Sequence, residues 1–121
     1  MSRAGAVVVV GPEGRAFVRA ELTQQIVVQP TVSRVPNTGV GMALVGGRVV
    51  SVLELGEPSR ALLVCEIDGE TVAFSGLGIE QVGLFEIDDQ GARVGNELLP
   101  ELAIRELVES AAQARNGARR T

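Results

Sequence analysis

A chain of 121 residues has the length of one domain, and its apolar content of 45% is enough to bury an ordinary core. Its net charge of −4 disfavours nucleic-acid binding, and its aromatic content of 2% leaves almost nothing to stack on bases. We therefore expect no nucleic-acid partner. The core must consist mainly of Val, Leu, Ile and Ala, and because β-branched residues favour strands, the composition predicts a mostly β domain.

Two features bear on the cellular compartment. No apolar run approaches the length of about 18 residues that a membrane span requires, and the run Ala6–Val10 is too short for a signal sequence. The single cysteine, Cys65, cannot form an internal disulfide, which is consistent with a reducing compartment. We expect a cytoplasmic protein with no membrane insertion.

The chain opens with a predicted strand pair, Ala6–Val10 and Arg15–Leu22, around a Gly-Pro-Glu-Gly turn. Within Leu22–Val28 we expect a short helical or irregular turn that leads into a strand. Prolines and glycines then interrupt any regular element from Pro30 to Gly39, because proline lacks a backbone donor and biases the preceding residue toward extended geometry. This segment is predicted to be a surface loop.

The stretch Val35–Leu55 is the centre of the predicted fold. It consists of an irregular beginning, a strand, the two-residue turn Gly46-Gly47 and a second strand. Two glycines between β-branched runs suit a tight hairpin, because its central residues take positive φ angles without steric cost. This hairpin is the element around which the other predicted strands are arranged.

Further turn signals divide the next part of the chain. Asp68-Gly69 predicts a tight hairpin, whereas two glycines within Phe74–Gly83 predict a bulge, a bend or a loop. The remaining predicted elements are a polar connector at Gly56–Arg60, strands at Ala61–Ile67, Glu70–Phe74 and Val82–Ile87, a turn at Asp88–Gly91 and a returning strand at Ala92–Val94.

The last element changes its hydrophobic period. Apolar residues recur at helical spacing, and Pro100 suits a first helical turn, so one helix is predicted over about residues 100–115. Two ion pairs at i, i+4 spacing, Glu101 with Arg105 and Arg105 with Glu109, are expected on its surface. Residues 1–115 are thus predicted to form a single domain. Residues 116–121 are predicted to be a flexible basic tail and not a binding arm.

Few residues could support catalysis. The sequence has no histidine, and Cys65 lies in an apolar strand without an adjacent base, so we expect an inert thiol. The acidic pairs Glu66 with Asp68 and Asp88 with Asp89 are interpreted as solvated turn residues, and Gly39-Val40-Gly41 lacks the remaining features of a phosphate-binding loop. We predict no enzymatic activity, no metal site and no cofactor.

The central stretch also carries a family resemblance. Val35-Pro36 is followed by Gly41, an apolar strand, the turn Gly46-Gly47 and a strand that ends in Glu54-Leu55. This pattern resembles the motif of CheW-like adaptor domains. The chain departs from the family's pattern in having Gly46 where the turn arginine is usual, Ser51 in place of a proline, and Leu44 in place of a polar residue before the turn.

The resemblance implies a fold of small β-barrels built from hairpins with one C-terminal α-helix, in which the compressed connector Gly56–Arg60 could trim one barrel. It also implies a non-catalytic scaffold that couples a chemoreceptor-like protein to a CheA-like histidine kinase in bacterial chemotaxis, a two-component system. The partner-binding positions it carries over are Val35, Pro36, Gly41, Gly47, Val49, Val52, Leu55, Ile79 and Val82, and Gly46, which replaces the turn arginine, is expected to be a partner-binding position beside them. We expect interface roles first for exposed residues near the Gly46-Gly47 turn.

One alternative of a different class stays open. A stand-alone structural or oligomerising β domain, derived from the same scaffold, would have the same composition and the same hairpins. The acidic net charge does not discriminate between this alternative and the adaptor.

Overall fold

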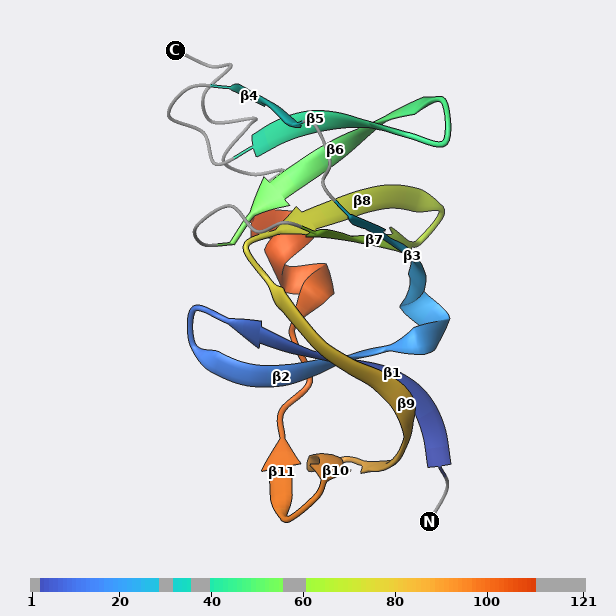
Figure 1. The fold of residues 1–121 in the computed structure, drawn as a ribbon, viewed down its shortest axis with the longest axis vertical. Helices are drawn as coiled ribbons and strands as arrows, with labels where there is room; N and C mark the ends of the chain where they lie inside the picture. Colours follow the sequence, from blue (N-terminus) through green and yellow to red (C-terminus); the bar gives the residue numbers. More distant parts are fainter. Residues whose placement is uncertain (1–2, 29–31, 36–39, 56–60, 111–121) are drawn as a thin grey trace.

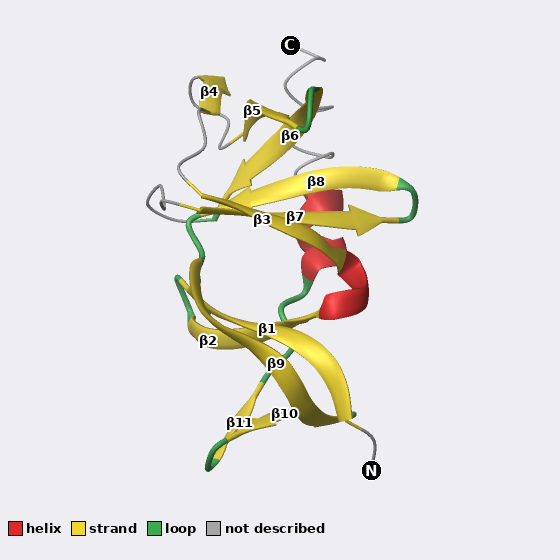
Figure 2. Cartoon of the chain, turned by 45° about the vertical axis from the view of Figure 1, so that its right-hand side comes forward, coloured by secondary structure: helices red, strands yellow, loops and turns green. Residues whose placement is uncertain are grey.

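The computed structural model describes residues 3–28, 32–35, 40–55 and 61–110. They form two curled β-sheets, one above the other in Figure 1, with a short helix against the six-stranded sheet. Figure 2 shows the same two layers after a turn of the view, with the helix at one side of the interface. The prediction of a mostly β fold with one C-terminal helix is confirmed.

The five-stranded sheet has the order β11-β10-β9-β1-β2, and all its neighbouring strands are antiparallel. Its strands are β1 (Arg3–Gly11), β2 (Gly14–Arg19), β9 (Gly78–Asp88), β10 (Gly91–Val94) and β11 (Glu97–Leu99). The first hairpin and the turn between β9 and β10 lie where the sequence predicted them. The β1–β9 register shifts between Val8 and Val9, and this irregularity agrees with the bulge or bend expected within Phe74–Gly83.

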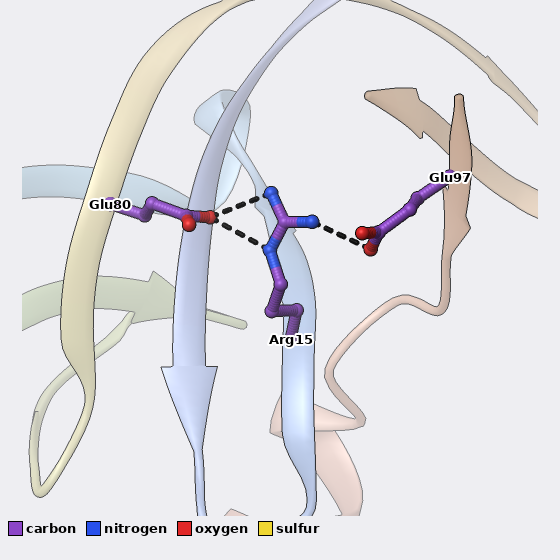
Figure 3. Close-up of polar contacts among 3 residues, drawn as sticks. All are labelled: Arg15, Glu80 and Glu97. Atoms are coloured by element: carbon purple, nitrogen blue, oxygen red, sulfur yellow. Dashed lines mark hydrogen bonds and ion pairs between the residues drawn. The ribbon is translucent and has the colours of Figure 1, made fainter. Parts of the chain in front are cut away.

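This sheet closes on itself through the segment that follows β11. The Phe17 N–H donates to the Pro100 carbonyl oxygen over 3.0 Å, and the Leu102 N–H donates to the Phe17 carbonyl oxygen over 2.9 Å. Arg15 on β2 adds a side-chain link, because its guanidinium reaches Glu80 on β9 at 2.8 Å and Glu97 on β11 at 2.6 Å (Figure 3). The outer strands β2 and β11 are therefore tied together, as in a small barrel.

The six-stranded sheet has the order β3-β7-β8-β6-β5-β4, and only β6 and β8 run parallel. Its strands are β3 (Thr23–Val28), β4 (Val32–Val35), β5 (Val40–Val45), β6 (Arg48–Glu54), β7 (Ala61–Ile67) and β8 (Glu70–Ser75). The one-turn 3₁₀ helix η1 (Ala20–Leu22) joins this sheet to β2. A helical turn was predicted within Leu22–Val28, but it comes earlier, in the last three residues of the predicted strand Arg15–Leu22, and Thr23–Val28 is strand throughout. The predicted connector Gly56–Arg60 lies outside the described residues.

Both tight hairpins have the predicted turn chemistry. Gly46 and Gly47 have φ angles of 57° and 80°, and Asp68 and Gly69 have φ angles of 51° and 84°. Two successive positive φ angles define the turn whose twist matches that of antiparallel strands. The turn dipeptides therefore fix the ends of β5–β6 and β7–β8.

The apolar residues separate into three buried clusters. The largest lies between the two sheets and contains Val7, Val18, Leu53, Phe74 and Ile104 among others. A second cluster is formed by strands of the six-stranded sheet alone, and a third, around Phe17, lies within the five-stranded sheet. Each sheet thus has its own interior, and the shared core holds the two sheets together.

The C-terminal helix begins later than the sequence predicts. It begins at residue 104, so Pro100 and Glu101 precede it, and the pair of Glu101 with Arg105 does not form. Glu101 instead binds Arg19 at 3.0 Å, and Arg105 binds Asp68 at 2.9 Å. The physical reason is that residues 100–102 bond to β2, which prevents them from entering the helix. The helix is described to residue 110; the predicted tail and the end of the domain lie outside the described residues.

Two strands were not predicted. Val32–Val35 forms β4 within the expected surface loop, because its backbone pairs with β5 between the two prolines that flank it. Glu97–Leu99 forms β11, which pairs with β10 after a turn at Gly95, where φ is 60°. Both are short strands whose partners, and not their own sequences, determine their conformation.

Candidate protein-interaction surfaces

The most exposed apolar side chains of the six-stranded sheet include three on the β5–β6 hairpin. Met42 is 49% exposed, and Leu44 and Val49 are each 70% exposed. Leu44 and Val49 are directly opposite in the antiparallel register, and Met42 is opposite Ser51. Because directly opposite residues point to the same side of a sheet, these three apolar side chains form one surface, which we call the hairpin patch.

Strand alternation explains why the hairpin patch is exposed. The intervening residues Ala43, Val45 and Val50 point to the other side and are buried in the interior of the six-stranded sheet. Further along the same side as the patch, Val40 and Leu53 pack into the core between the sheets. On this side of the hairpin, the residues far from the turn therefore lie in the core, and the residues near the turn are exposed to solvent.

The predicted site residues before the hairpin turn have different environments. Val35 ends β4 opposite Val40, and Pro36 lies outside the described residues. Gly41 is buried where β4 crosses close to β5: a Cβ atom there would lie 2.8 Å from Val32 Cγ1. Gly46 and Gly47 form the exposed turn, with open space where a Cβ would be. The turn glycines are thus accessible, whereas Gly41 serves the packing of strands.

The other predicted site residues are divided by burial. Val49 belongs to the hairpin patch, and Val82 on β9 is 63% exposed. Val52 is completely buried, and Leu55 and Ile79 are partly buried against the core between the sheets. The structure therefore brings Val49 beside the turn glycines, but it places Val82 on the other sheet.

Sequence reasoning assigned no binding role to Met42, Leu44 or Leu84. Leu44 stands where the CheW-like pattern has a polar residue, and that departure is the sequence signal for an exposed apolar position. In the strand Val40–Val45 every residue is apolar or glycine, so hydropathy alone does not show which side is exposed. Leu84 on β9 is 69% exposed and follows Val82 at the spacing that puts both on one side.

A groove of about 490 Å³ opens between the sheets beside the helix. Its apolar part includes side chains from β1, β2 and the segment before the helix, and Arg15 and Glu101 supply charge. The residues that line it are Val9, Gly11, Pro12, Glu13, Gly14, Arg15, Ala16, Leu55, Leu77, Pro100, Glu101, Leu102, Ala103 and Leu107. Its volume is within the range of small binding clefts, and Leu55 is the one predicted site residue that reaches it.

Cys65, Asp68 and Asp88 have structural partners or buried surroundings. Cys65 is fully buried, and burial raises the pKa of its thiol to about 11, although a hydrogen bond with Thr23 opposes the shift. Asp68 is paired with Arg105, and Asp88 accepts the Gln90 N–H at 2.8 Å within its turn. Among the residues that the structure describes, no three His, Cys, Asp or Glu side chains gather as metal ligands, and no helix is long and apolar enough to span a bilayer.

Comparison with solved structures identifies the fold. The scaffolding protein TtCheW from Thermoanaerobacter tengcongensis superposes with a TM-score of 0.65 over 81% of this chain and 87% of its own. The two sequences share 14% identity. No protein-family model matches the sequence, and no curated protein matches it either. Two curled sheets and a C-terminal helix in this arrangement are a CheW-like fold.

Proposed function

We propose that this protein is a non-catalytic adaptor that couples a chemoreceptor-like protein to a CheA-like histidine kinase in a bacterial two-component system for chemotaxis. The proposal places it in the cytoplasm. It is supported by the fold that the chain shares with a scaffolding protein. The observation that carries it is the hairpin patch, in which Leu44 and Val49, opposite each other, are each 70% exposed.

Exposed apolar pairs of this kind favour protein association. Leu44 and Val49 lie next to a turn that has no bulky side chain, so a partner surface can approach both closely. Burying two such side chains in an interface contributes on the order of 1.5–3 kcal/mol each, which is the scale of an interface hot spot. In the proposed arrangement, the hairpin patch docks on the kinase, the groove between the sheets accepts a helical receptor tip, and the exposed Gly46-Gly47 turn is a further receptor contact, as the family resemblance implies.

Gly46 sets a limit on the receptor contact. It stands where the family has a turn arginine, and glycine cannot supply a guanidinium with its fixed charge and several donors. We therefore expect this chain to bind a receptor tip more weakly than its Gly46→Arg variant. The φ of 57° at this position makes a side chain strained by about 1–2 kcal/mol, so melting must show that the variant remains folded.

The test is two separate titrations, one with a CheA-like kinase regulatory fragment and one with a receptor-tip peptide. Leu44→Glu and Val49→Glu should each weaken kinase binding at least about tenfold, because a carboxylate in an apolar interface must be desolvated. Val28→Glu is the matched control, since Val28 is 69% exposed on β3 and lies outside the patch. Equal losses in all three variants would show that the hairpin patch is not the docking surface.

Failure of both titrations would favour the alternative, a structural or oligomerising domain. A simple independent observation is the identity of the genes adjacent to the one that encodes this chain. An adjacent receptor or histidine kinase gene supports the adaptor, and the absence of both supports the alternative.

A further inference from the structure

A second surface, on the other sheet, is unused by the proposed adaptor role. Strand β9 pairs with β1 along Gly78–Glu86, whereas on its other edge β10 pairs only with Glu86–Asp88. Within the described part of the chain, residues 79–85 therefore have no strand partner on that edge, and no further backbone hydrogen bond compensates. The outward-facing N–H and C=O groups of this segment are available to another strand.

This edge lacks the usual protection against pairing. Residues 81–85 contain no proline and no charged side chain, and Gly83 adds no bulk. Val82 and Leu84 are 63% and 69% exposed on the same side of the strand. Soluble proteins commonly block such an edge with lysine, proline or a bulge. In β9 the irregular register lies beside Glu80, outside residues 81–85. An apolar, unblocked edge of this length is a site for strand addition.

We propose that a second copy of this chain pairs its own β9 edge with this one, antiparallel across a twofold axis at Val82. A twofold arrangement with Val82 opposite Val82 of the other copy gathers both Val82 and both Leu84 side chains on one side of the joined sheets. It places Glu80 opposite Leu84. An axis at Gly83 would instead place Glu80 opposite Glu86, and like charges directly opposite destabilise a strand pair.

A second copy fits this edge better than an unrelated segment does. The edge needs an extended strand that presents two exposed apolar side chains at alternate positions and places no carboxylate opposite Glu80 or Glu86, and β9 of a second copy meets both requirements in the Val82 register. A contact of about seven residues per copy is smaller than a standard interface, so we expect a weak, concentration-dependent dimer.

The first test is sedimentation equilibrium of the full chain from low micromolar to millimolar concentration. The native protein should show a monomer–dimer equilibrium, and Val82→Glu and Leu84→Glu should each raise its dissociation constant at least about tenfold. Leu44→Glu is the matched control, because it is equally exposed but lies on the hairpin patch, and its dimerisation should be unchanged. A native monomer at every concentration, or a dimer lost only in Leu44→Glu, would overturn the proposal.

The second test examines the register. Directly opposite residues of antiparallel strands have Cβ atoms about 4.5–5.5 Å apart, close to disulfide reach. Val82→Cys should therefore form a cross-linked dimer under mild oxidation. The native chain, whose single thiol is buried, should not, and Leu84→Cys should not because its thiols would lie apart. Cross-linking of Leu84→Cys without Val82→Cys would exclude the axis at Val82. These results are independent of kinase and receptor binding.

Discussion

The buried thiol of Cys65 predicts how stability changes at alkaline pH. Cys65 lies in the middle of β7 with no exposed surface, and burial raises its pKa from the ordinary value of 9.0 to about 11, with Thr23 opposing the shift. In the unfolded chain the thiol ionises near its ordinary pKa, whereas in the folded protein it stays neutral up to about pH 11. Ionisation is thus easier after unfolding.

The sign and size of the effect follow from this difference. Because the folded pKa is the higher one, the stabilisation is fully present below about pH 9 and is lost as the pH rises toward about 11. Each pH unit between the two pKa values contributes about 1.4 kcal/mol, so the free energy of unfolding should fall by roughly 2–3 kcal/mol over this window. Other titrations hardly interfere, because the chain has no His or Tyr and all 11 basic residues are Arg.

The assay is urea unfolding followed by far-UV circular dichroism, since the chain has no Trp or Tyr for fluorescence. Unfolding free energies are measured at several pH values between about 8.5 and 11, for the native protein and for Cys65→Ala. The native values should fall, and the variant's values should stay level from a lower start. A level native curve, or an equal fall in both proteins, would refute the burial argument. Native labelling by a thiol reagent at neutral pH should also be slow.

Two further predictions concern packing. Gly41→Ala should lower the free energy of unfolding by about 1–3 kcal/mol in urea, because its Cβ would lie 2.8 Å from Val32 Cγ1. This loss should be smaller in a Val32→Ala background. Gly78→Ala is the control and should cost little, because its Cβ would meet only ordinary contacts at 3.7 Å. Ile104→Ala should lower stability by about 2–5 kcal/mol, because Ile104 is 3% exposed in the core. Arg105→Ala should lower stability by at most about 1 kcal/mol, because its ion pair with Asp68 is largely solvated. Similar losses of stability for both variants in thermal melts would contradict this.

Local turn chemistry explains what could be predicted from the sequence. Gly46-Gly47 and Asp68-Gly69 specify two hairpins because few dipeptides adopt two successive positive φ angles, and this requirement is independent of the rest of the chain. The apolar strand context of Cys65 likewise predicted its burial, because a continuous apolar run is typical of a strand with both faces buried: Val64 lies in the core of the six-stranded sheet and Cys65 in the core between the sheets. These features depend on residues close together in sequence.

Other features depend on distant residues and could not be read locally. The strand Val32–Val35 exists because Gly41 lets its backbone approach β5, a contact that no local pattern records. The helix begins at residue 104 and not at 100 because residues 100–102 bond to Phe17, far earlier in the chain. Period and capping signals describe only the helix's own preferences, and tertiary hydrogen bonds override them here.

The candidate site shows the same limit in a more specific form. Within the family-like motif, Val49 and Val52 are chemically identical, yet Val49 is 70% exposed and Val52 is fully buried. Because they are three residues apart in one strand, they lie on opposite sides of the sheet. A motif made of valines therefore combines positions that hold the fold with positions that can meet a partner, and only the register separates them. Substituting Val52 should change stability first, whereas substituting Val49 should change binding with little effect on stability, a difference that parallel melting and titration of Val52→Ala and Val49→Ala would measure.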